Sequence, residues 1–214
     1  MLILALDTCL AACQAALWRD GEAVGVVSEP MTRGHQERLA PMVRDLLATT
    51  GVELATLDRV GVTVGPGSFT GLRVGLAFAK GLALAMDKPL VGVSALEALA
   101  QGHDGGPNLI LVDARREQAY WQAFKADAPL TPPQAWTLPD IADWAIEHGP
   151  PRRLIGPGAH LLGARFPDAE VDARAAADPL AIAALAARRT PGDVRPLYLR
   201  TPDAKLPGGI DPWA

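Results

Sequence analysis

The chain has 214 residues, a formal net charge of −4, and 49% hydrophobic but only 5% aromatic residues. This length accommodates one large domain or two of about 100 residues each, with a core built mainly from Ala, Val and Leu. No run of Lys or Arg exceeds two residues, so the basic stripe of proteins that bind nucleic acid by themselves is missing. Any contact with RNA is therefore expected to be shared with a partner.

Targeting and redox signals are also missing from the pattern. The opening residues MLILALD carry no basic region and have an acid at position 7, which predicts a strand and not a signal peptide. The longest apolar helical stretch contains Arg73 and Lys80 and ends at Asp87, which argues against a membrane span. Cys9 and Cys13 lack the spacing of a redox or zinc pair. We expect a soluble, cytoplasmic protein with free thiols.

Hydrophobic spacing in the first half of the chain predicts the element order β-β-β-α-β-α-β-α. Alternating, β-branched segments predict strands, and apolar residues three and four positions apart predict helices. In chain order the expected elements are strands at Leu2–Leu6, Ala12–Trp18 and Ala23–Ser28, a helix within Gln36–Ala48, a strand at Arg59–Val64, a helix at 69–86, a strand at Leu90–Val93, and a short helix capped by Ser94 that ends at Ala100.

A linker, QGHDGGP at Gln101–Pro107, separates this pattern from a partial repetition of it. LILALD at residues 2–7 is echoed by LILVD at residues 109–113, each with an Asp at the strand end and another strand after it. Two α/β units, residues 1–101 and 102–214, with a cleft between them are therefore expected. The remaining expected elements are helices from Thr137 to His148 and from Asp178 to Ala187, a last strand at Pro196–Arg200, and a loosely held tail, LPGGIDPWA.

A strand, a glycine-rich turn and a small-residue helix run together at residues 59–86. Ser68 or Thr70 can cap the helix that follows the turn Gly65-Pro66-Gly67. Backbone N–H groups at a helix N-terminus can bind a phosphate, although the turn lacks the Gly-Lys-Ser/Thr of a Walker loop and the third glycine of a dinucleotide fingerprint. The alternative interpretation is a tight turn with a packing role.

The helix after this turn carries small residues every four positions, at Gly71, Gly75, Ala79 and Ala83. Each interior glycine costs about 1 kcal/mol of helix stability relative to alanine. This cost suggests that another backbone packs closely against the face that the small residues form. One face of such a helix packs on its own sheet. We interpret this bare surface as shaped for docking onto a partner.

Two aspartates at strand ends, Asp7 and Asp113, are expected to face each other across the cleft, as in ATP-dependent sugar kinases, heat-shock ATPases and actin. Neither is followed by a glycine that would let a phosphate approach. We therefore expect a cleft that has lost the residues needed for catalytic turnover. Its candidate residues are Asp7, Thr8, Gly65, Gly67, Ser68 and Asp113.

The histidine spacing gives no support to metal chemistry, because no two of the four lie on a common helix face. We therefore expect no metal site and no catalytic residue. The four positions are His35, His103, His148 and His160.

Five blocks of the sequence closely resemble the bacterial TsaB (YeaZ) family, and the late PLYLRTP at 196–202 also fits it. The blocks span nearly the whole chain: LALDTC at 4–9, GHQERLAPMVRDLL at 34–47, VGPGSFTGLRVGLAFAKGLAL at 64–84, GVSALEALA at 92–100 and DARREQAY at 113–120. The resemblance implies an α/β fold with two duplicated actin-like, heat-shock-ATPase-like (ribonuclease H-like) subdomains, the second reduced.

The resemblance also implies a function. It predicts a non-catalytic scaffold or activator that acts with the paralogue TsaD and the small ATPase TsaE in threonylcarbamoylation of the adenosine next to the anticodon of tRNAs that read codons beginning with A. tRNA is contacted through the complex, ATP or ADP could lie at the shared interface, and a homodimer could form when the partner is absent. The implied docking residues are Glu37, Met42, Leu72, Arg73, Gly75, Leu76 and Ala79.

Two other functions are weighed against this one. A nucleotide-dependent phosphotransferase of the sugar-kinase class would use Asp7 as base or metal-water ligand and the turn at 65–71 for phosphate. A metallopeptidase is disfavoured by the histidine spacing.

Overall fold

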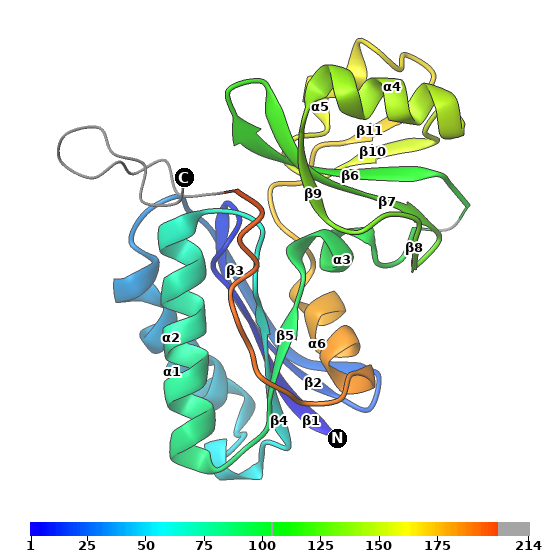
Figure 1. Ribbon diagram of the computed structural model, residues 1–214. Coiled ribbons are helices and arrows are strands. Elements are labelled where there is room, and N and C mark those ends of the chain that lie inside the picture. Colours follow the sequence, from blue (N-terminus) through cyan, green and yellow to red (C-terminus); the bar gives the residue numbers. More distant parts are fainter. Residues whose placement is uncertain (104, 201–214) are drawn as a thin grey trace, which may run out of the picture.

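The computed structural model describes residues 1–103 and 105–200 of the chain, which form two β-sheets with flanking helices (Figure 1). The first sheet has the strand order β3-β2-β1-β4-β5. Its strands are β1 (Leu2–Asp7), β2 (Ala12–Arg19), β3 (Glu22–Pro30), β4 (Arg59–Thr63) and β5 (Leu90–Val93).

Strand directions place two helix N-termini at one edge of this sheet. Strand β2 is antiparallel to β1 and β3, whereas β4 runs parallel to β1 and β5. Helix α1 (His35–Thr50) and the 3₁₀ turn Leu54–Thr56 connect β3 to β4, and α2 (Phe69–Met86) connects β4 to β5. Both helices therefore begin at the carboxyl ends of parallel strands. They pack side by side (Figure 1).

The second sheet repeats this topology in the order β11-β10-β6-β7-β8, with β9 paired to β7. Strand β7 is antiparallel to β6, as β2 is to β1. Strands β10 and β11 run parallel to β6, as β4 and β5 run parallel to β1. Its elements are β6 (Asn108–Arg115), β7 (Gln118–Lys125), β8 (Ala128–Pro129), β9 (Gln134–Thr137), α4 (Leu138–His148), β10 (Arg153–Ile155), α5 (His160–Gly163) and β11 (Glu170–Asp172).

Each half ends in a helix that contacts the sheet of the other half. Helix α3 (Ala95–Ala100) packs against β6 and β7, and α6 (Pro179–Arg188) packs against β1, β2 and β4. The larger core surrounds the first sheet and includes Ile182 of α6. The smaller core surrounds Trp121, whose ring lies 5.1 Å from that of Trp136 and 5.0 Å from that of Trp144.

The fold class predicted from the sequence is confirmed, because the second sheet repeats the strand topology of the first. The second half differs in having four strands before its first helix, and its helices α4 and α5 are shorter than α1 and α2. The division at residues 101 and 102 stays a prediction, although α6 leaves the second half of the chain to cover the first sheet. The predicted tail LPGGIDPWA lies outside the described residues.

Three departures from the sequence predictions concern short segments. Pro196–Arg200 is not a strand, because Leu197 N–H donates one bond to the Val64 carbonyl (2.7 Å) and Pro196 has no N–H to donate. Strands β8 to β11 and helix α5 were not predicted from the sequence. They span two to four residues, too few for a hydrophobic period to show.

Helix α2 is the one helix among the described residues whose length and composition would suffice to cross a membrane. Core helices of soluble proteins share these properties, and 33% of this window is buried inside the fold. Arg73 and Lys80 lie within it.

Candidate functional site

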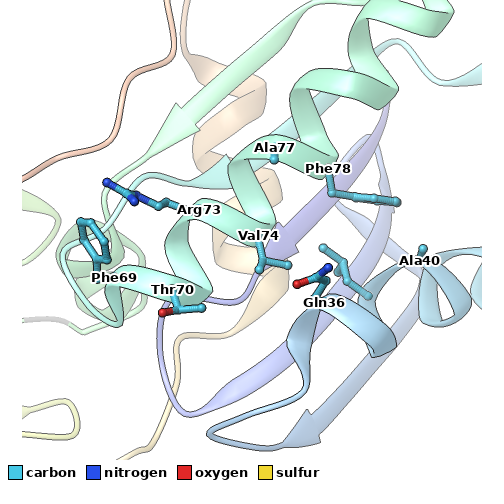
Figure 2. Close-up of a pocket in the computed structure, with 9 residues that line it drawn as sticks. Gln36, Ala40, Phe69, Thr70, Arg73, Val74, Ala77 and Phe78 are labelled. Atoms are coloured by element: carbon cyan, nitrogen blue, oxygen red, sulfur yellow. The ribbon is translucent and has the colours of Figure 1, made fainter.

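A groove of about 500 Å³ lies between α1 and α2. Figure 2 shows Val74 and Phe78 of α2 extending toward α1, which contributes Gln36 and Ala40. Most of the lining side chains are apolar, and Arg73 stands at one end. The lining residues are Gln36, Leu39, Ala40, Phe69, Thr70, Arg73, Val74, Ala77 and Phe78.

The outer face of α2 continues this groove with small and apolar side chains. Ala77, Gly81 and Ala85 are exposed at four-residue spacing, and a Cβ atom built on Gly81 would meet nothing within 4 Å. Leu84 beside them is 85% exposed. Helices that face only water normally carry polar residues on that side, and exposed apolar patches are typical of interaction surfaces. This outer surface, Ala77 to Ala85 with the groove, is the candidate site.

The bare seam predicted for docking lies on the opposite side of α2, inside the subdomain. A Cβ atom on Gly71 would lie 2.0 Å from the Thr8 carbonyl oxygen, and one on Gly75 would lie 2.5 Å from Thr8 Oγ1. Ala79 and Ala83 are buried as well. The interpretation of this seam as a partner surface was wrong, because Thr8, the residue just after β1, already packs closely against it. A bulky residue at Gly75 would disturb the fold itself.

The predicted docking residues divide accordingly. Glu37 and Arg73 are exposed and available to a partner. The others are in the core, because α1 packs on β2 and β3 and α2 packs on β4. The buried members of the predicted set are Met42, Leu72, Gly75, Leu76 and Ala79.

An aromatic cluster marks the N-terminal end of α2. The Arg73 guanidinium carbon lies 3.6 Å from the centre of the Phe69 ring, and the Tyr198 ring is 5.6 Å from the same ring. Arg73 Nε also donates to the Tyr198 hydroxyl (3.1 Å). Phe69 is 49% exposed and was not among the predicted site residues. Sequence offers no signal for Tyr198, because it is far from Phe69 along the chain.

The glycine-rich turn before α2 is explained by packing. A Cβ atom on Gly67 would lie 2.1 Å from the Cys9 carbonyl oxygen, which also accepts the Ser68 N–H (2.7 Å). Gly65 has a φ of +96°, and its carbonyl accepts the Ala95 N–H. Of the two predicted caps, Ser68 and not Thr70 caps α2, because its hydroxyl accepts the Gly71 N–H at 3.2 Å. The turn thus joins β1, β4 and α3.

The two strand-end aspartates have different environments. Asp7 is fully buried, and its Oδ1 accepts from the Thr63 hydroxyl (2.5 Å) and the Cys9 N–H (2.9 Å). Asp113 is partly exposed, accepts the Arg115 N–H (2.7 Å) and pairs with the Arg115 guanidinium (3.2 Å). These contacts make Asp7 a constituent of the core and Asp113 a cap of its own strand end.

A cavity of about 520 Å³ between the two halves corresponds to the expected cleft. Gly67, Ser68 and Asp113 line it, whereas Asp7, Thr8 and Gly65 do not. Arg115 and Tyr120 also line it. The residues of the predicted degenerate cleft are therefore brought together only in part, and that the cleft has lost the residues needed for turnover stays a prediction.

The described residues offer few groups suited to thiol or metal chemistry. Cys9 and Cys13 are buried and unpaired, and burial raises the pKa of both thiols, that of Cys13 to about 11. Across residues 1–103 and 105–200, no three His, Cys, Asp or Glu side chains gather in a cluster suited to a metal ion.

Comparisons with known proteins place this geometry in a family. The family model described as TsaD, tRNA N6-adenosine threonylcarbamoyltransferase, matches residues 17–129. The Escherichia coli protein named tRNA threonylcarbamoyladenosine biosynthesis protein TsaB is 43% identical over 59% of this chain and 56% of its own length. The chain thus matches only about half of that relative. An uncharacterized Mycobacterium tuberculosis protein is 35% identical over 95% of this chain and 93% of its own length.

Solved structures agree with the sequence matches. YeaZ from Pseudomonas aeruginosa superposes with a TM-score of 0.76 at 27% identity, covering 92% of this chain and 100% of that one. A second structure, titled an uncharacterized protein with similarity to peptidase YEAZ from Pseudomonas aeruginosa, gives a TM-score of 0.75 at 31% identity over 93% and 99% of the two chains. These matches, together with the two duplicated subdomains and the turn at 65–67, show that the chain belongs to the TsaB (YeaZ) family.

Proposed function

We propose that this chain acts in the biosynthesis of threonylcarbamoyladenosine in tRNA as a non-catalytic subunit in the cytoplasm. It pairs with a TsaD-type paralogue, joins the ATPase TsaE, and contacts tRNA only through that complex. The names of its relatives support the pathway. The net charge of −4, without a basic stripe, supports indirect contact with tRNA.

One observation carries the docking proposal: the outer surface of α2 is open and presents small and apolar residues beside Arg73 and Lys80, although its inner seam is already packed. Leu84 extends into solvent and Gly81 leaves room for another backbone. Helices that present small residues in this way allow a partner helix to approach closely. The paralogue, or a second copy of the chain when the paralogue is absent, would add its own helices to α1 and α2.

A substitution on this surface tests the pairing. We expect Leu84→Asp to weaken binding to the TsaD-type paralogue by about tenfold or more, because it buries an unpaired charge in an apolar interface. Isothermal titration calorimetry of the two purified subunits measures the affinity. The matched control is Ile146→Asp on α4, where the replaced side chain is 51% exposed but lies in the second half. Equal affinities of the two variants, with unchanged circular dichroism, would remove the docking proposal.

The absence of independent catalysis needs its own experiment. The purified chain without its paralogue should transfer no threonylcarbamoyl group to tRNA, because Asp7 is buried outside the cleft and Asp113, which lines it, is paired with Arg115. Transfer by the chain alone would contradict the proposal. Micromolar to low-millimolar binding of Mg-ATP by the chain alone would instead favour the phosphotransferase alternative.

A further inference from the structure

Arg73 begins the outer row of small residues on α2. Every fourth residue after it is Ala77, Gly81 and Ala85, and all four positions are exposed. A partner helix that packs along this row would therefore pass the Arg73 side chain. No Asp or Glu occurs within α2, so this helix supplies no carboxylate to neutralise the charge.

Two aromatic residues hold the Arg73 side chain in place. Its guanidinium carbon lies over the Phe69 ring, 3.6 Å from the ring centre, and its Nε donates to the Tyr198 hydroxyl (3.1 Å). Figure 2 shows Arg73 and Phe69 together at the end of the groove. A cation–π contact and a hydrogen bond restrict the rotamers of a side chain that is otherwise highly mobile on a protein surface. Arg73 is therefore ordered before a partner binds.

The environment of Arg73 differs from that of other arginines in the fold. Arg38 and Arg189 donate to the carboxylates of Glu29 and Glu97. Arg73 pairs with no carboxylate in the described part of the chain, and its two terminal nitrogens have no acceptor there. These nitrogens form an edge of the guanidinium that fits both oxygens of a carboxylate. Arginines are also enriched among the residues that dominate the binding energy of interfaces.

We propose that Arg73 binds a carboxylate side chain on the docking helix of the TsaD-type paralogue, and that Phe69 and Tyr198 position it for this contact. The inference rests on the proposed pairing and adds the chemistry of the partner surface, an Asp or Glu opposite Arg73. Because the side chain is ordered in the free chain, less entropy is lost on binding. A phosphate of tRNA would fit the same edge, but the net charge of −4 and the lack of a basic stripe favour the carboxylate.

Isothermal titration calorimetry with the purified paralogue, in the absence of tRNA, tests the contact. We expect Arg73→Gln to weaken binding by about tenfold, and Arg73→Glu by about tenfold more, because like charges would then face each other. The matched control is Lys80→Gln, since Lys80 is an exposed cation further along the same helix. It should change the affinity by less than about twofold.

Tyr198→Phe tests the positioning role, because it removes only the hydroxyl that accepts from Arg73 Nε. We expect it to weaken binding by about threefold in the unmodified chain and to have no effect in the Arg73→Gln background. An equal loss in both backgrounds would show that Tyr198 contacts the partner itself, and the positioning role would be wrong.

The other outcomes decide the carboxylate. Equal affinities of Arg73→Gln and Arg73→Glu, or equal losses for Arg73→Gln and Lys80→Gln, would overturn the proposal. A loss for Arg73→Gln that appears only when tRNA is added would overturn it as well and assign Arg73 to an RNA phosphate. If Leu84→Asp weakens pairing and the Arg73 variants do not, the proposed pairing stands and this inference fails. If none of these changes weakens pairing, both fail.

Discussion

The two halves of the molecule share a strand order but differ in the helices that cover their sheets. Helices α1 and α2 of the first half have 16 and 18 residues, whereas their counterparts α4 and α5 have 11 and 4. The outer side of α4 exposes three carboxylates, Asp140, Asp143 and Glu147, beside Ile146. That of α2 exposes no carboxylate within the helix, and its small and apolar residues Ala77, Gly81, Leu84 and Ala85 lie beside Arg73 and Lys80. The same scaffold therefore has an acidic outer helix in one half, and in the other a row of small and apolar residues bordered by two cations.

The turns that follow the corresponding strands β4 and β10 are identical in sequence. Gly65-Pro66-Gly67 and Gly156-Pro157-Gly158 both begin with a glycine at positive φ, and both pack their second glycine closely against backbone. Gly67 meets the Cys9 carbonyl just after β1, and Gly158 meets backbone atoms of Leu111 to Asp113 within β6. A shared turn with a shared contact indicates a packing role. What distinguishes the first half is the long helix after the turn, and not the turn itself.

Substituting the second glycine of each turn should give the largest effects. Gly67→Ala should lower the free energy of unfolding by about 3 kcal/mol or more, because the new methyl group would meet the Cys9 carbonyl oxygen at 2.1 Å. Gly158→Ala should cost less, about 1–2 kcal/mol, because its nearest atom lies at 2.9 Å. Urea denaturation followed by circular dichroism measures both. A larger cost at Gly158 would contradict the packing account.

The alkaline stability of the protein should depend on the first half, because both thiols lie there. Burial raises the pKa of Cys13 from 9.0 to about 11, so the folded state holds its proton where the unfolded state has lost it. The stability that this thiol contributes is present below pH 9 and declines between about pH 9 and pH 11. Urea midpoints across that range should fall less steeply for Cys13→Ala than for the unmodified chain. Identical slopes would show that another group titrates.

The smallest expected changes in stability come from glycine-to-alanine substitutions on the two faces of α2, and they should differ in sign. Gly81→Ala should raise the free energy of unfolding by about 0.5–1 kcal/mol, because the outer position is open and alanine favours a helix. Gly75→Ala should lower it, since the methyl group would meet Thr8 Oγ1, which is held by its bond to the Gly71 carbonyl (2.7 Å). The same denaturation experiment checks the sign. Stabilisation by both changes would contradict the buried position of the seam.

The sequence by itself determined the strands and helices of the first half and the duplicated α/β class, and it narrowed the cap of α2 to Ser68 or Thr70. These depend on local periodicity and capping, which a single segment carries. It also contained two small-residue rows on α2, one through Gly75 and one through Gly81. Periodicity gives both rows the same signature, so it could not say which one is buried.

Only the tertiary structure decided which row faces the sheet and which faces solvent, because that depends on where the end of β1 comes to lie. Thr8 fills the space beside Gly71 and Gly75, which leaves the row at Ala77, Gly81 and Ala85 open. Contacts between residues far apart in the chain, such as Arg73 with Tyr198, are settled in the same way. Helical period fixes the faces of a helix, but their surroundings are fixed by packing from elsewhere in the fold.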